Sequence, residues 1–275
     1  EAKKGDCGRF APGLPKINDG QQLFVLNGLS KLAPNGKMAI IQDASPLYAG
    51  DAGSGSSNIR QYILENDWLD AIIRLSTSQF MNTPIGTYIW VISKNKPDYR
   101  VGKVQLIDAS ECYKVRRRPI GKKRNDITTE CAKLIVQAYG EYKDDMHYGI
   151  DEVWCESKIF PIEEFGSTKI VVERPLYYDN GKIIHKNGKP VADTALRDSE
   201  LVPMKIDIDE YLQKEIKPYE PDAWIDKKKT KIGYEIPMIR YFYNFPQFKG
   251  HDELFEELKN IEATIQKYMK ILFED

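Results

Sequence analysis

A large aromatic residue stands in an otherwise polar stretch of the chain. Phe80 lies within the polar segment 76–84, and the run 85–92 behind it has the β-branched and aromatic composition of a buried strand. A phenylalanine in such a loop can plug the end of a sheet, as buried aromatic side chains commonly do. It can also offer a flat face on which a nucleic-acid base stacks. Composition alone leaves both roles open.

A dense group of positive charges lies between residues 114 and 124. This run has Pro119 and Gly121 within it and no acidic residue, and seven of its eleven residues are basic: Lys114, Arg116, Arg117, Arg118, Lys122, Lys123 and Arg124. We expect an irregular cationic loop that contacts DNA phosphates, with a solvated surface loop as the alternative. The run 226–231 (DKKKTK) is a weaker candidate, since it can equally cover a subunit interface.

Other kinds of site find little support in the sequence. The four cysteines and three histidines are scattered without Cys-x-x-Cys spacing, which argues against a structural zinc site. With 40 basic and 41 acidic residues, the net charge of −1 carries no information about partners. No apolar run approaches the ~20 residues of a membrane helix, and the first residues do not form a signal peptide. We therefore expect a reduced, cytoplasmic protein with no metal and no membrane association.

The polar loop belongs to a region of alternating helices and strands. The expected elements are helices at 21–32 and 59–64 and strands at 37–42, 69–75, 85–92 and 104–108. This order indicates an α/β sheet, in which the strand at 37–42 is buried. The strands at 85–92 and 104–108 are separated only by turn residues, so we expect them to pair antiparallel. Ligands bind beyond the carboxyl ends of strands in such sheets, which makes the loops 43–48 and 76–84 the expected walls of a site.

Several blocks of the sequence closely resemble the modification (M) subunit of type I restriction–modification systems. They are GRFAPGLPKINDGQQLF, the stretch 43–96 from DASPLYAG to WVISKNK, VQLIDAS, ERPL at 173–176, and PDAWIDKKKTKIGYEIPMIRYFY at 221–243. Such subunits are DNA adenine-N6 methyltransferases that use S-adenosylmethionine. The resemblance implies an α/β fold: the C-terminal half of a Rossmann-like methyltransferase sheet with an antiparallel edge, then a small α+β tail and a C-terminal helix.

Two motifs of that family have no counterpart here. The glycine loop that binds the cofactor and the Asn-Pro-Pro-Phe/Tyr catalytic motif lie upstream of GRFAPGLPKINDG in the family, and the sequence contains neither. We therefore expect a C-terminal fragment with no catalytic residue of its own. Alone, it should neither bind S-adenosylmethionine tightly nor methylate DNA.

The resemblance gives roles to two aromatic residues. Phe80 matches the aromatic of the family's base-binding loop, so an adenine flipped out of the duplex is expected to stack on it. Phe24 has the spacing before the Leu-Ala-Pro-Asn-Gly turn at which related enzymes contact the adenine of the cofactor. Because Phe24 also falls in the apolar stripe of its helix, a core position is the alternative. Methylation of an amino nitrogen in this class relies on hydrogen bonding, so we assign no role to nearby acidic residues: Asp43, Asp51 and Asp70.

The resemblance and the sequence pattern divide the chain into four parts. These are the C-terminal part of the methyltransferase domain (1–110), a basic loop and helical connector (111–165), a tail domain (166–250) and a partner-binding helix (251–275). The connector should contain a helix at 126–142, and the tail should contain hairpins at its Asn-Gly turns.

The last helix should carry an apolar stripe at three- to four-residue spacing: Leu254, Leu258, Ile261, Ile265, Tyr268 or Met269, and Leu272. In the resembling family this end packs with helices of the specificity subunit, and docking back onto its own domain is the alternative. The partners implied are double-stranded DNA, the specificity subunit, a second M subunit and the restriction (R) subunit.

Two other functions compete with this interpretation. One is an amino-methyltransferase acting on protein or RNA, which would share the sheet. The other is a non-catalytic DNA-binding scaffold. The segment KTKIGYEI and the terminal helix favour the restriction–modification complex over the first, and the Phe80 loop favours a methyltransferase over the second.

Overall fold

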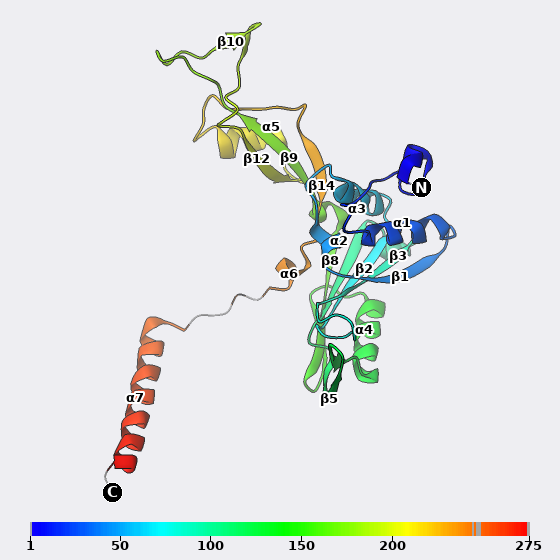
Figure 1. The fold of residues 1–275 in the computed structure, drawn as a ribbon, viewed down its shortest axis with the longest axis vertical. Helices are drawn as coiled ribbons and strands as arrows, with labels where there is room; N and C mark the ends of the chain where they lie inside the picture. Colours follow the sequence, from blue (N-terminus) through cyan, green and yellow to red (C-terminus); the bar gives the residue numbers. More distant parts are fainter. Residues whose placement is uncertain (1, 244, 246–248, 274–275) are drawn as a thin grey trace. The chain divides into compact units, whose positions relative to one another are not determined.

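The computed structural model describes residues 2–243, 245 and 249–273 (Figure 1). The chain divides into two compact units, Glu1–Met238 and Ile239–Asp275, which are described separately below. None of the described helices combines the length and the hydrophobicity needed to span a membrane.

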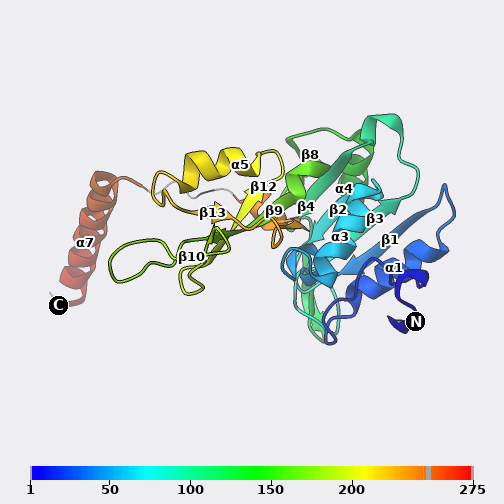
Figure 2. The ribbon, with the colours of Figure 1, turned by 90° about the horizontal axis from the view of Figure 1, so that it is seen from above.

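The larger unit is built around a six-stranded mixed sheet (Figures 1 and 2). Its strand order is β1 (Lys37–Gln42), β3 (Tyr88–Ser93), β2 (Leu69–Leu75), β4 (Lys103–Ala109), β8 (Val153–Pro161) and β7 (Met146–Ile150). Only the β2–β4 neighbours are parallel. Strands β1, β2 and β4 nevertheless point the same way, because β3 runs antiparallel to both of its neighbours. The strands β7 and β8 come from the segment expected to be a connector.

The expected pairing of 85–92 with 104–108 is wrong, because β2 lies between these strands. β3 pairs with β1 and β2, and β4 lies on the other side of β2. The crossover 94–102, which includes the short helix η2 (Asp98–Arg100), is fixed across the start of β2 by ion pairs. Lys96 Nζ lies 2.5 Å from Asp67 Oδ1, and Arg100 Nη1 lies 3.2 Å from Asp70 Oδ1. These contacts carry the chain past β2 before β4 begins.

The strand at 37–42 forms as expected, but it is not buried. β1 pairs with β3 alone among the described strands, and its side chains at 37, 39 and 41 are exposed. Ile41 keeps half of its surface accessible. A short apolar run looks the same in an edge strand and in a central strand, because it indicates hydrophobicity and not the position of the strand in the sheet.

Helix α4 (Thr129–Glu141) covers one face of the sheet and confirms the helix expected at 126–142. The side chain of Thr128 accepts a hydrogen bond from the backbone of Cys131 and caps its start. Its inner face packs with residues of β2, β4, β7 and β8 in one buried cluster that includes Ile73 and Ile107. The helices α1 (Gln21–Lys31) and α3 (Gly55–Glu65) pack against each other elsewhere on the same unit. The short helix η1 (Ala2–Cys7) comes before α1 in the chain.

A smaller sheet has β9 (Gly166–Glu173) as its central strand, which follows the short helix η3 (Ile162–Phe165). β9 pairs with β12 (Asp198–Pro203) on one side and with β13 (Trp224–Ile225) and β14 (Lys231–Tyr234) on the other. The helices α5 (Ile208–Tyr211) and η4 (Leu212–Ile216) complete its core. The Asn-Gly turns expected in this region are present. They close a meander that includes β10 (His185–Lys186) and β11 (Lys189–Pro190), with positive φ at Gly181, Asn187 and Gly188.

The segment KTKIGYEI joins the two sheets. Tyr234 receives a hydrogen bond on its carbonyl from Arg60 Nε, and its backbone N–H donates to Ser57 Oγ at 3.1 Å. Arg60 also donates to the carbonyl of Ala49 at 2.9 Å. Burial lowers the pKa of Arg60 to about 10. The guanidinium therefore holds β14 onto α3. The segment KTKIGYEI thus has a structural role.

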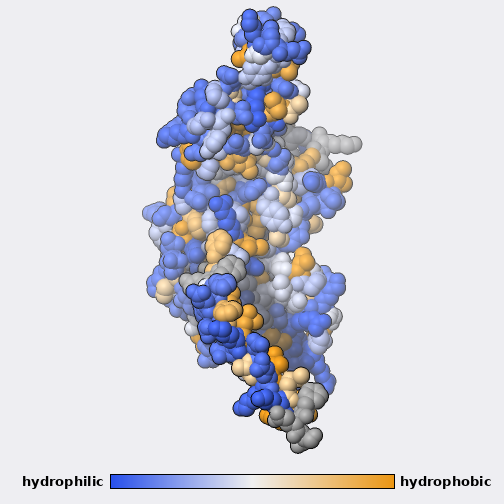
Figure 3. Space-filling view, turned by 90° about the vertical axis from the view of Figure 1, so that its left-hand side faces the viewer, coloured by the Kyte–Doolittle hydropathy of each residue, from blue (hydrophilic) through white to orange (hydrophobic). Residues whose placement is uncertain are grey.

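The smaller unit contains the predicted C-terminal helix, α7 (His251–Phe273). In the sequence it follows the short helix α6 (Met238–Tyr241), whose first residue belongs to the larger unit. The apolar side chains of α7 are exposed, and Figure 3 shows apolar atoms running along the helix among hydrophilic ones. The positions 254, 258, 261, 265, 268 and 272 alternate in steps of four and three residues. This is the 3.5-residue period of a coiled-coil seam.

Candidate functional site

The carboxyl ends of β1, β2 and β4 meet at one edge of the main sheet, as their common direction requires. Gln42 pairs with Tyr88, Tyr88 with Arg74, and Arg74 with Asp108, so these residues form one row across four strands. Just beyond this row lie the loop after β1, which contains α2 (Ser45–Tyr48), and the loop after β2, which contains Phe80. The structure thus brings together the two loops expected to wall the site.

A polar row forms the floor between these loops. Arg74 Nη1 lies 3.0 Å from Asp108 Oδ2. Burial raises the pKa of Tyr88, while the Arg74 guanidinium beside its hydroxyl acts in the opposite direction. Tyr48, from the loop after β1, lies close enough to Tyr88 to affect the same group and is itself exposed. The sequence does not predict this row, because the order and register of the strands decide which of their polar residues become neighbours.

The side chain of Phe80 is neither fully buried nor fully exposed. It is partly buried, and it is not among the described residues of the buried cluster beneath α4. The preceding residue Gln79 is buried and donates to Ser76 Oγ. Ser78 has a φ of 56°, a left-handed conformation that costs a non-glycine residue about 1–2 kcal/mol. Strain of this kind persists only where surrounding contacts hold it, and it gathers at functional sites.

Phe24 is not part of the apolar stripe of its helix. The buried residues of α1 are Gln22, Val25, Leu26 and Leu29, whereas 69% of Phe24 is exposed. The core position considered as an alternative for Phe24 is therefore wrong. One helical turn before it, the side chain of Gln21 accepts a hydrogen bond from the backbone of Asp43 at 2.9 Å. Residues three apart share a helix face, so Phe24 projects from the face that borders the end of β1.

The acidic residues near the site have structural partners. Asp43 Oδ1 accepts the backbone N–H of Ser45 at 2.8 Å, Asp51 pairs with Lys169 at 2.9 Å, and Asp70 is buried against Arg100. No described group of three or more His, Cys, Asp and Glu side chains is arranged to hold a metal ion. The four cysteines are unpaired, and three of them are buried.

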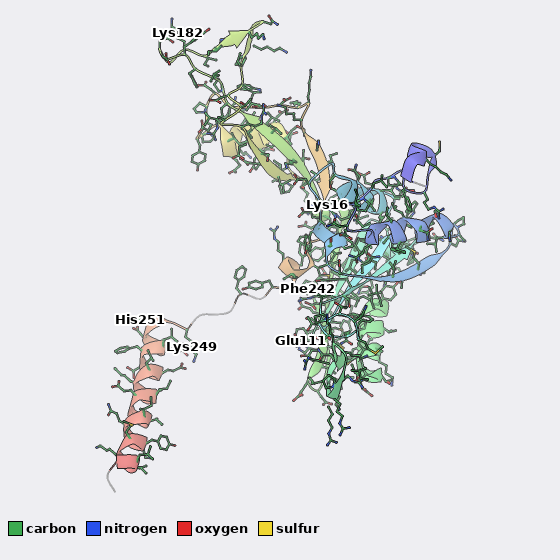
Figure 4. The ribbon with its side chains drawn as sticks, in the orientation of Figure 1. Lys16, Glu111, Lys182, Phe242, Lys249 and His251 are labelled. Atoms are coloured by element: carbon green, nitrogen blue, oxygen red, sulfur yellow. The ribbon has the colours of Figure 1, made fainter. Side chains whose placement is uncertain are left out.

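A cavity of about 450 Å³ lies next to the loop after β1. Its lining includes Asp19 and Ser45, whose side chains hydrogen-bond to each other, together with Lys16, which is labelled in Figure 4. It extends to the first residues of α3. Asp19 thus links the segment before α1 to the carboxyl edge of β1.

The basic run is a hairpin and not the irregular loop that its proline and glycine suggested. β5 (Lys114–Ile120) pairs antiparallel with β6 (Lys123–Asp126), and Gly121 with a φ of +58° supplies the turn. Two of its seven cations are neutralised within the hairpin. Arg116 Nη1 and Lys123 Nζ lie 2.5 Å and 3.0 Å from the carboxylate oxygens of Asp126, and these contacts lower the pKa of Asp126.

Four of the other five cations of the hairpin extend into solvent. The fifth, Lys114, is exposed at the start of β5 and lies near Glu130. In the part of the chain that the structure describes, no carboxylate pairs with Arg117, Arg118, Lys122 or Arg124, and all four are exposed. Figure 4 shows side chains with nitrogen tips projecting beyond the end of β5, and Glu111 lies where the chain leaves the sheet for the hairpin. This surface can contact phosphates.

The hairpin also contacts the Phe80 loop directly. The backbone N–H groups of Arg124 and Asn125 both donate to the carbonyl of Ser78, at 2.9 and 3.2 Å. Lys122 N–H donates to the carbonyl of Met81 at 2.9 Å, and Asn125 Nδ2 to that of Thr77 at 2.9 Å. The sequence does not predict this contact, because no local pattern links segments about forty residues apart.

Comparison with known proteins agrees with the resemblance seen in the sequence. Residues 1–171 match the family model described as N-6 DNA Methylase. The type I restriction enzyme MjaIX methylase subunit of Methanocaldococcus jannaschii is 28% identical over 77% of this chain and 38% of its own length. The HindI methylase subunit of Haemophilus influenzae is 25% identical over 84% of this chain and 47% of its own length.

Among solved structures, the type I restriction-modification system methyltransferase subunit from Streptococcus thermophilus is similar to 60% of this chain, with a TM-score of 0.49 and 27% identity, and 32% of that chain is covered. The chain thus spans less than half the length of the relatives it matches. The family model covers more than half of the chain. This chain belongs to the N-6 DNA methylase family, and its relatives are methylase subunits of type I restriction enzymes.

Proposed function

We propose that this chain supplies the target-base wall of a DNA adenine-N6 methyltransferase and the contacts of that subunit with its complex. One observation carries the proposal most directly. A partly buried aromatic residue on a strained loop lies beside a hairpin with four exposed cations, which have no carboxylate partner among the described residues, at the carboxyl edge of the sheet. A flipped adenine needs a stacking face, and the duplex from which it comes needs phosphate contacts.

The cofactor proposed for the complete enzyme is S-adenosylmethionine, which supplies the methyl group when bound. The exposed ring of Phe24, on the helix face that borders the end of β1, fits a contact with the adenine of this cofactor. The sequence lacks the glycine motif with which the family binds the rest of this molecule. We therefore propose that the chain forms only part of the cofactor site.

The isolated chain is expected to show no methyl transfer and no tight cofactor binding. One wall of each site cannot replace the backbone carbonyl and the side-chain amide that hold the target amino group in this family. Calorimetry with S-adenosylmethionine and transfer of radiolabelled methyl groups to duplex DNA check this. Micromolar cofactor binding by the isolated chain would contradict the proposed division of the site.

In the complete enzyme, Phe24→Ala is expected to weaken S-adenosylmethionine binding by roughly tenfold, because stacking on an adenine contributes about 1–3 kcal/mol. Phe24→Tyr keeps the ring and should bind almost normally. Ile17→Ala is a suitable control, since Ile17 is a fully exposed apolar residue of the preceding segment. Equal affinities of Phe24→Ala and Ile17→Ala would exclude Phe24 from the cofactor site.

We propose double-stranded DNA, the specificity subunit, a second M subunit and the R subunit as partners. The exposed coiled-coil seam of α7 is suited to a partner helix, which supports the specificity subunit as its ligand. The DNA contact is assigned to the β5–β6 hairpin. A digest of DNA methylated by the complete enzyme tests the reaction itself, because it must yield N6-methyladenine and no methylated cytosine.

A further inference from the structure

We propose that the β5–β6 hairpin positions the Phe80 loop, with Gly121 and Asn125 as the positioning residues. Contact with the DNA backbone and stacking of the flipped adenine would then be made by one connected piece of the protein. This inference rests on the proposed function and extends it from the residues that touch DNA to those that hold them in place.

The first support is the density of hydrogen bonds between the two segments. Ser78, which precedes Phe80 by two residues, receives two hydrogen bonds on its carbonyl from the hairpin backbone and donates its own N–H to Pro84 at 3.0 Å. Its left-handed conformation is therefore held from both sides. Asn125 adds a side-chain bond to Thr77. Without these bonds, the strain at Ser78 favours a different conformation of the loop.

The second support is the close approach at Gly121. A Cβ at this position would lie 2.6 Å from the carbonyl oxygen of Met81, the residue directly after Phe80. The obstacle is backbone and cannot rotate away, so the hairpin can contact the loop this closely only with glycine at the turn. A larger residue must separate the two segments or displace the loop.

The test compares two glycine variants in the complete enzyme. Gly121→Ala introduces both an unfavourable φ and the collision with Met81. Gly102→Ala introduces the same kind of φ, +71° in the native chain, but nothing lies within 4 Å of its Cβ. We expect Gly121→Ala to lower the kcat of methylation at least tenfold, since small misplacements of a reacting group can cost up to about a hundredfold. Its affinity for DNA should change by less than about threefold, because the cations remain. Gly102→Ala should retain normal kcat.

Asn125→Ala provides a second variant that does not force a collision. We expect it to lower kcat severalfold, whereas Asn95→Ala, which removes an exposed amide hydrogen bond to Asn35, should not. A mismatch at the target adenine separates positioning from general damage, because flipping a mismatched base costs less. Both hairpin variants should recover most of their lost rate on mismatched DNA.

The outcomes distinguish this inference from the function on which it rests. If Phe80→Ala methylates normally, the proposed stacking role fails. If Phe80→Ala is slow while Gly121→Ala and Asn125→Ala match their controls, only the positioning role fails. Equal losses on matched and mismatched DNA would also overturn it, since a merely structural defect does not depend on the cost of flipping.

Discussion

Replacing Phe80 with alanine in the complete enzyme is expected to slow methylation of DNA by roughly ten- to a hundredfold. The ring would hold the flipped adenine, and base–aromatic stacking contributes about 1–3 kcal/mol per base. Phe80→Tyr and Phe80→Trp keep an aromatic face and should retain most of the activity. Affinity for S-adenosylmethionine should hardly change, because the cofactor contact is assigned to a different element.

The alternative role of Phe80 as a plug predicts a different result. Removing a buried phenylalanine leaves a cavity and typically lowers the free energy of unfolding by about 3–5 kcal/mol. Phe80 is only partly buried, so we expect a smaller change in stability. Met81→Ala is a matched control, because Met81 lies in the same loop with 63% of its surface exposed. A Phe80→Ala enzyme that unfolds readily but methylates at the normal rate while folded would disprove the stacking role.

Local elements were predictable where one periodic pattern dominated. The strand at 69–75 and the helix within 126–142 match β2 and α4, because β2 is almost entirely buried and α4 has an apolar face with a threonine cap. The terminal helix and the Asn-Gly turns were predicted for similar local reasons. Each of these features depends on residues within about four positions of one another.

Two errors arose where neighbouring strands decide the outcome. The place of β4 on the far side of β2 depends on the crossover that Lys96 and Arg100 fix against Asp67 and Asp70. The hairpin β5–β6 carries no buried face, so it shows none of the alternation by which strands are recognised. Its pairing becomes visible only in three dimensions.

The candidate site shows the same division between local and distant information. The family resemblance identified Phe80 and Phe24 as candidate site residues. The apolar periodicity of α1, in contrast, assigns Phe24 to the buried face of the helix, whereas the structure exposes it. Gln22, a polar residue, takes the buried position instead and donates hydrogen bonds to the carbonyls of Pro46 and Ser56. A polar side chain can be buried here because distant backbone carbonyls accept its hydrogen bonds. A hydropathy pattern contains no information about such distant groups.

A double variant, Arg117→Ala with Arg118→Ala, is expected to weaken DNA binding by the complete enzyme on the order of tenfold to fiftyfold at 0.1 M salt. Each lost phosphate contact should reduce the slope of log affinity against log salt concentration by about 0.9, so the slope should fall by up to about two. The loss should be nearly equal on cognate and unrelated sequences, because phosphates carry no sequence information.

The internal ion pairs of the hairpin supply a graded comparison for this result. Arg116 already forms an ion pair with Asp126. Arg116→Ala should therefore reduce the salt slope less than Arg117→Ala or Arg118→Ala does. Lys227→Ala, in the turn between β13 and β14, removes an exposed cation paired with Asp209, and we expect it to leave the slope unchanged. Measurements of DNA affinity across a series of salt concentrations give the slope for each variant. A loss confined to the cognate sequence, or an unchanged slope in the double variant, would mean that the hairpin cations are only solvated, and phosphate recognition would have to lie elsewhere in the enzyme.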